Sequence, residues 1–134
     1  MLIPRRLLDG LIAHALEDPK NEVCGLIAVE PGPPAQAVRL HRAINKHASP
    51  LRFEIEAQEQ FKLYRAIEQE GLEVGALYHS HVRSKPYPSQ TDIAFAANLS
   101  DLEWVIVGLA GDEPEVRCYL IEEGQIMEVA LEVE

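Results

Sequence analysis

The chain has 134 residues, of which 47% are hydrophobic, and its 12 basic and 22 acidic side chains give a formal net charge of −10. A chain of this length buries a substantial core, so we expect one folded domain over residues 1–134 and no wholesale disorder. An acidic chain without a basic stripe argues against binding to DNA or RNA, and no apolar run reaches the roughly 20 residues of a membrane helix. We read no secretory signal peptide and expect a cytoplasmic protein.

Hydrophobic spacing and turn residues divide the chain into alternating helices and strands. We expect helices at residues 4–17, at residues 56–70 and from Ser89 onward, and strands at residues 23–29, 37–42, 73–79, 104–109, 116–121 and 125–133. The resulting order, α-β-β-α-β-α-β-β-β, is typical of an α/β or α+β sandwich in which helices pack against a mixed central sheet. The pattern does not assign each helix to one face of that sheet.

Apolar residues that recur at helical spacing define the sides expected to face the core. They are Leu8, Leu11, Ile12, Ala15 and Leu16 in the first helix, Ala57, Phe61, Tyr64 and Ile67 in the second, and Ile93, Ala96 and Ala97 in the third. Residues 23–29 are continuously apolar, as expected of a central strand that is covered on both faces. Cys24 and Cys118 lie in apolar runs, which predicts two buried thiols rather than a disulfide.

One segment concentrates metal-binding side chains: His79-Ser80-His81 is followed, after seven residues, by Ser89 and Asp92. Histidines at i and i+2 of a strand point to the same side of a sheet. Asp92 falls in the first turn of the next helix, and the intervening loop is long enough to bring it back over the strand end. Two imidazoles and a carboxylate are a ligand set for a catalytic zinc with water in the fourth position, and zinc lowers the pKa of that water to about 7.

A site of this kind needs a proton shuttle that is not a ligand, and Glu22 is the candidate because it directly precedes the first buried strand. If that strand neighbours the strand that ends at His79, the carboxyl group can reach the water and later protonate a leaving amine. Ser89 can donate its hydroxyl to an oxyanion. Each part is weak alone, since Ser89-x-x-Asp92 is also an ordinary helix-capping pattern. The joint spacing favours the metal site.

Together, Glu22, His79-Ser80-His81, Ser89 and Asp92 resemble the signature of the JAMM (MPN+) metalloproteases, the zinc isopeptidases of deubiquitinating enzymes and their bacterial relatives. The similarity runs through most of the chain. It implies an α/β fold like that of the cytidine deaminases, with a mixed central sheet packed between helices. It also implies one Zn²⁺ on His79, His81 and Asp92, Glu22 as general acid/base and Ser89 as oxyanion stabiliser. Val82 stands where the family usually has proline, which removes no ligand.

The chain is little longer than the family's catalytic core and resembles its short bacterial members. That likeness implies a peptidase for the bond after the C-terminal Gly-Gly of a small ubiquitin-fold sulfur-carrier protein, with release of cysteine. A thin glycine tail suits backbone pairing along a strand edge. The alternatives are an isopeptidase for lysine-linked conjugates of ubiquitin-like modifiers, and a non-catalytic scaffold, against which the complete ligand set argues. A homodimer is an open alternative to a monomer.

Other residues leave further alternatives open. The Cys-x-x-Cys pair of nucleoside deaminases is missing from the sequence, which argues against that class of zinc enzyme. Cys24 is either a second zinc-site thiol or, in the favoured interpretation, a core residue. His14, expected on a helix surface, and His41 and His47 have no partners at ligand spacing. The loop at residues 45–53 forms either one wall of a substrate groove or a plain connection.

Overall fold

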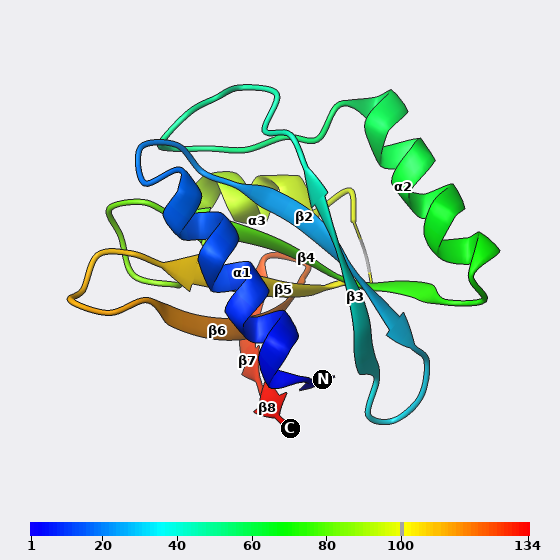
Figure 1. Ribbon diagram of the computed structural model, residues 1–134. Helices are drawn as coiled ribbons and strands as arrows, with labels where there is room; N and C mark the ends of the chain where they lie inside the picture. The colour runs from blue at the N-terminus through cyan, green and yellow to red at the C-terminus, as the bar shows by residue number, and fades with distance from the viewer. Residues whose placement is uncertain (100) are drawn as a thin grey trace.

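The computed structural model describes residues 1–99 and 101–134. Within these residues, three helices accompany a single sheet of eight strands in the order β7-β6-β5-β4-β2-β3-β1-β8 (Figure 1). The helices are α1 (Arg5–Glu17), α2 (Ala57–Gln69) and α3 (Gln90–Ala96); the strands are β1 (Leu2–Ile3), β2 (Cys24–Glu30), β3 (Gln36–Ala43), β4 (Glu73–His81), β5 (Glu103–Gly108), β6 (Glu115–Glu122), β7 (Gln125–Val129) and β8 (Glu132–Val133). This architecture confirms the expected mixed α/β fold.

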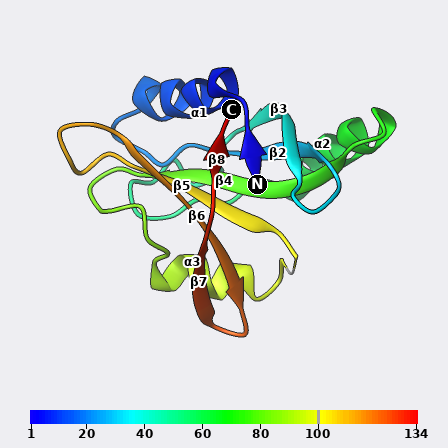
Figure 2. The same ribbon diagram turned by 90° about the horizontal axis from the view of Figure 1, so that it is seen from below.

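The segment expected as one strand over residues 125–133 forms two strands, because the pairing changes partner inside it. β7 ends at Val129 after pairing with β6, and the chain then pairs as β8 with β1, where Leu2 lies opposite Glu132. β1 was not expected, since a strand of two residues shows no alternation of apolar and polar positions. The C-terminal segment therefore joins both ends of the strand order and curls the sheet (Figure 2).

The sheet separates two apolar clusters. α1 covers one face, where Leu11, Tyr78 and Val105 are buried. α3 lies on the opposite side of the sheet, as Figure 2 shows. The second apolar cluster, on that side, includes Trp104 of β5 and Ile67 of α2. Alternate residues of a strand point to opposite faces, so neighbouring residues of β4 serve different clusters.

Part of the expected helix faces is exposed. Leu16 is 54% exposed and Phe61 63% exposed, and Ala57 and Ala97 are also on the surface, so these four core assignments are wrong. α2 contacts the sheet mainly at β3 and β4, and of its residues only Ile67 is fully buried. The helix therefore covers less of the sheet than its apolar pattern implies.

Strand pairing places the start of β2 beside the end of β4. The two strands are antiparallel, with Cys24 opposite His79, so Glu22 and His81 come to the same edge of the sheet. β4 and β5 are parallel and are joined through α3, which returns the chain to that edge. None of the helices in the described part of the chain is long and apolar enough to cross a membrane.

Candidate metal centre

The end of β4 presents two imidazoles on one face of the sheet and a hydroxyl on the other. His79 and His81 are both buried on the side of α3. Ser80 points the opposite way, where its Oγ accepts a hydrogen bond from the Val23 N–H at 2.9 Å, while its own N–H donates to the Val23 carbonyl at 3.1 Å. Ser80 therefore fastens the end of β4 to the backbone that follows Glu22.

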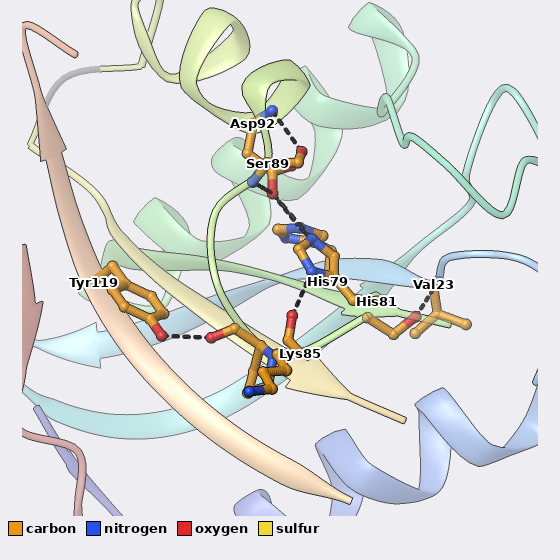
Figure 3. A network of polar contacts seen from close by, with 9 residues as sticks. Val23, His79, His81, Lys85, Ser89, Asp92 and Tyr119 are labelled. Atoms are coloured by element: carbon orange, nitrogen blue, oxygen red, sulfur yellow. Dashed lines mark hydrogen bonds and ion pairs between the residues drawn. The ribbon is translucent and has the colours of Figure 1, made fainter. Parts of the chain in front are cut away.

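The first turn of α3 brings a carboxylate to the two imidazoles. Ser89 is the N-cap: its Oγ accepts the Asp92 N–H at 3.1 Å, and its own N–H donates to Asp92 Oδ2 at 3.0 Å. The same Oδ2 lies 3.2 Å from His79 Nε2 and 3.0 Å from His81 Nε2, and the two Nε2 atoms are 3.1 Å apart (Figure 3). The hydrogen bonds between Ser89 and Asp92 that cap α3 therefore also place the Asp92 carboxylate beside the two imidazoles.

These three donor atoms fit a single divalent cation. They converge in a buried site and lie within 4.8 Å of one another, close enough to share one ion. Two imidazole nitrogens and one carboxylate oxygen suit Zn²⁺ and leave a fourth position open, as a catalytic zinc requires. The site also keeps buried polar atoms without partners among the described residues, including His79 Nδ1 and Glu22 Oε1.

The loop between β4 and α3 orients one of the imidazoles. His81 Nδ1 lies 3.0 Å from the Lys85 carbonyl, which assigns the ring proton to Nδ1 and leaves the Nε2 lone pair directed at the centre. The loop is held in turn by the Tyr119 hydroxyl, which donates to the Pro86 carbonyl. It also packs tightly on the end of β5, since a Cβ on Gly108 would lie 2.5 Å from Pro86 Cδ.

Burial and charge set the protonation of the three donors. Burial opposes the charged form of Asp92, but the two imidazoles and the Ser89 N–H outweigh it and hold the Asp92 pKa well below its ordinary value. Burial lowers the pKa of His79. Burial also opposes the charged form of His81, yet the bonds to Asp92 and the Lys85 carbonyl raise its pKa. A carboxylate that stays ionised is the form that binds a metal ion.

Glu22 lies beside this group without belonging to it. The side chain is 5% exposed, and burial raises its pKa to about 8, against the effect of nearby His81. A divalent cation in the centre would favour the charged form. A hollow of about 390 Å³ is lined by Glu22, by Asn45 and by the end of α1. The carboxyl group can therefore take up and release a proton near neutral pH and borders a space open to solvent.

The loop after β3 contacts the centre directly. Phe53 is buried and stacks on His79, with ring centroids 4.4 Å apart and planes at 26°. Trp104 meets the same imidazole edge-on, with centroids 5.8 Å apart. The loop at residues 45–53 is therefore more than a plain connection, because its Phe53 packs on the imidazole of His79.

Cys24, His14 and His47 lie in surroundings that explain them without a metal-binding role. Cys24 is fully buried in the apolar cluster, where burial raises the pKa of its thiol to about 12, so the core interpretation holds. His14 is half-buried rather than on the surface, with Nδ1 2.8 Å from the Tyr78 hydroxyl. His47 Nε2 lies 2.9 Å from Glu54 Oε1.

Sequence reasoning missed the contributions of Ser80 and Phe53. Ser80 carried a usable signal, since a hydroxyl in a strand that is buried on both faces must find a hydrogen-bond partner. Phe53 carried a weaker one, as the only phenylalanine in an otherwise polar and irregular stretch. The Lys85 carbonyl had no signal, because a backbone atom contributes irrespective of residue type.

Fold and site together define a metalloprotease-like centre. The family described as prokaryotic homologs of the JAB domain matches residues 4–122, and the chain belongs to it. It is 31% identical to the CysO-cysteine peptidase of Mycobacterium tuberculosis, over 99% of this chain and 90% of that protein. A desampylase of Pyrococcus furiosus is 29% identical (100% and 91% covered), and a probable TtuB-protein conjugate cleaving protease of Thermus thermophilus is 36% identical (99% and 82%).

Solved structures show the same fold. A protein from Desulfitobacterium hafniense superposes with a TM-score of 0.89 at 23% identity, covering 100% of this chain and 93% of that one. A JAB1/MPN domain protein from Archaeoglobus fulgidus gives 0.65 at 22% identity (100% and 96% covered). A JAMM structure, reported as a metalloprotease-like zinc site in the proteasome and signalosome, gives 0.61 at 22% identity (100% and 97%). The expected resemblance to JAMM proteins is thereby confirmed.

Removal of a ligand should empty the centre. We expect about one zinc per purified wild-type chain and almost none in His79→Ala or Asp92→Ala, because each loses one of three protein ligands. Elemental analysis after dialysis measures this, with His47→Ala as a control that removes a histidine outside the group of three donors. Wild-type protein as metal-poor as the two ligand variants would contradict the assignment.

Proposed function

We propose that the chain is a zinc-dependent peptidase that hydrolyses the bond after the C-terminal Gly-Gly of a small ubiquitin-fold sulfur-carrier protein. The observation that carries the proposal is the convergence of His79, His81 and Asp92 beside the buried carboxyl group of Glu22. The relatives named for peptidase, desampylase and conjugate-cleaving activities support a hydrolase of this type. One Zn²⁺ per chain is the proposed cofactor, on the two histidines and Asp92.

Each residue has a distinct role in the proposed reaction. A zinc ion held by His79, His81 and Asp92 would supply Lewis acidity toward the scissile carbonyl and water. Glu22 accepts a proton through its unpartnered carboxyl oxygen and later donates it to the departing amine. Ser89 Oγ already accepts the Asp92 N–H, so its hydroxyl proton is free to be donated to the developing oxyanion.

Two leaving groups are open to this chemistry. Release of cysteine comes first, because the chain aligns over 99% of its length with a protein named CysO-cysteine peptidase. Cleavage of a lysine-linked conjugate is the second candidate, because the relative with 36% identity is named for cleaving protein conjugates. Both place the same Gly-Gly tail at the metal and differ only in the amine that departs.

We further propose that residues 1–134 act as one catalytic domain in the cytoplasm. All five proposed site residues lie within one chain. The complete set of candidate ligands argues against the alternative, a scaffold without catalysis.

Substitution of the proton shuttle should separate metal binding from catalysis. Glu22→Gln should keep its zinc and lose nearly all activity, because the amide cannot accept a proton. Ser89→Ala should also keep zinc and lose activity by about a hundredfold or more, with about 1 kcal/mol of lost helix capping. Metal analysis, steady-state kinetics and thermal unfolding measure the three effects. Loss of zinc from Glu22→Gln would show that this carboxylate is a ligand instead.

The carrier substrate is tested by mass. Zinc-loaded enzyme should remove cysteine from a carrier that ends in Gly-Gly-Cys, and a carrier with Ala-Ala before the cysteine should be a poor substrate, since glycines pass closest to the metal. Intact-protein mass spectrometry before and after incubation detects the loss. Cleavage of a lysine-linked conjugate alone would overturn cysteine release, and equal cleavage of the Ala-Ala carrier would overturn the requirement for glycine.

A further inference from the structure

The backbone of Glu22 is held by a segment outside the sheet. Glu22 comes before β2 begins at Cys24, so the strand pairing does not include it. Its N–H donates to the Ser49 carbonyl at 2.8 Å, and its carbonyl accepts from Asn45 Nδ2 at 3.0 Å. The N–H and the carbonyl of Glu22 are therefore both hydrogen-bonded to the loop that follows β3.

Asn45 is the centre of that loop. Its Nδ2 donates a second hydrogen bond to the Arg52 carbonyl at 3.0 Å, while its Oδ1 accepts the His47 N–H at 3.1 Å and the Glu54 N–H at 3.2 Å. Two donor hydrogens and two acceptor lone pairs are all that a side-chain amide offers, so its capacity is fully used. One side chain thereby fixes both ends of the loop and joins them to Glu22.

We propose that Asn45 is the positioning residue for Glu22, and that its amide sets where the carboxyl group of Glu22 stands relative to the metal ligands. The inference rests on the proposed role of Glu22 as general acid/base. Proton transfer depends on the placement of the reacting groups, and a misplacement of about 1 Å can cost about a hundredfold in rate. Asn45 forms no hydrogen bond with the three metal donors among the described residues, so its effect reaches the site through the Glu22 backbone and through the loop that carries Ser49 and Phe53.

Other hydrogen bonds of the loop do not involve Glu22, and removing one of them gives a matched control. The His47 side chain pairs with Glu54, and Ser49 Oγ accepts the Leu51 N–H at 3.0 Å. His47→Ala removes the first of these and keeps every bond of Asn45, because Asn45 uses only the backbone N–H of His47. His47→Ala therefore loosens the loop without breaking its bonds to Glu22, whereas a variant at Asn45 breaks the bond to the Glu22 carbonyl.

Asn45→Asp and Asn45→Ala form the test pair. The aspartate keeps the acceptor oxygen for His47 and Glu54 but replaces the Nδ2 donor, whereas the alanine loses all four bonds. In zinc-loaded protein, both should lower kcat by about 10- to 100-fold, with zinc content unchanged and KM within about twofold. His47→Ala should stay close to wild type in kcat. Thermal unfolding shows whether each variant is folded.

A second readout is independent of activity. Amide hydrogen exchange, followed residue by residue by NMR, should be at least about tenfold faster at Glu22 in both Asn45 variants, because the Glu22 N–H is protected by the Ser49 carbonyl of the loop that Asn45 organises, and unchanged at His79 and His81. If kcat and Glu22 exchange respond equally to His47→Ala, or if the Asn45 variants lose zinc, the positioning role is overturned. Wild-type enzyme that is inactive on every carrier substrate would overturn the proposed function, while the exchange data would still decide whether Asn45 holds Glu22.

Discussion

The approach of one carboxylate oxygen to two imidazole nitrogens is the constraint on which the site depends. Asp92 Oδ2 lies 3.2 Å and 3.0 Å from the Nε2 atoms of His79 and His81. Burial of a charged group is costly unless it is paired and hydrogen-bonded. Here the capping N–H of Ser89 and the two rings compensate for that burial. The start of α3 must therefore stand over the end of β4, and the intervening loop is fixed by the same requirement.

The side chains on the two faces of β4 have different roles: one face packs the fold together, and the other carries the candidate metal donors. Tyr78 and Ser80 face α1, and the Ser80 hydroxyl accepts a hydrogen bond from the N–H of Val23, the residue before β2. His79 and His81 face the other side, where Phe53 and Trp104 surround the first imidazole. Because β2 runs antiparallel to β4, Glu22 arrives at the same edge as the ligands although it is remote in sequence. The sheet thus sets the positions of His79 and His81 and brings Glu22 to the same edge, and the first turn of α3 with its cap sets Ser89 and Asp92.

Much of this arrangement was predictable, because local patterns carry it. The i, i+2 spacing of the histidines and the capping spacing of Ser89 and Asp92 are properties of one strand and one helix start. Val82, in place of the usual proline, does not prevent the loop from returning Asp92 to the centre.

What escaped prediction depends on pairing between distant segments. β8 forms where the two ends of the chain meet, and β1 lies between it and β3. The exposure of Phe61 depends on how little of the sheet α2 covers. Asn45 stands in a polar loop where asparagine is common, and only the folded chain shows that its amide reaches the Glu22 carbonyl.

The central claim is that His79, His81 and Asp92 hold a zinc ion with one position open to water. X-ray absorption at the zinc edge of the purified protein tests it most directly. The account predicts nitrogen and oxygen donors at about 2.0–2.1 Å, with an imidazole signature that is lost in His79→Ala. A sulfur donor at about 2.3 Å would contradict it, because Cys24 lies opposite His79 in the strand pairing and would then be a ligand rather than a core residue.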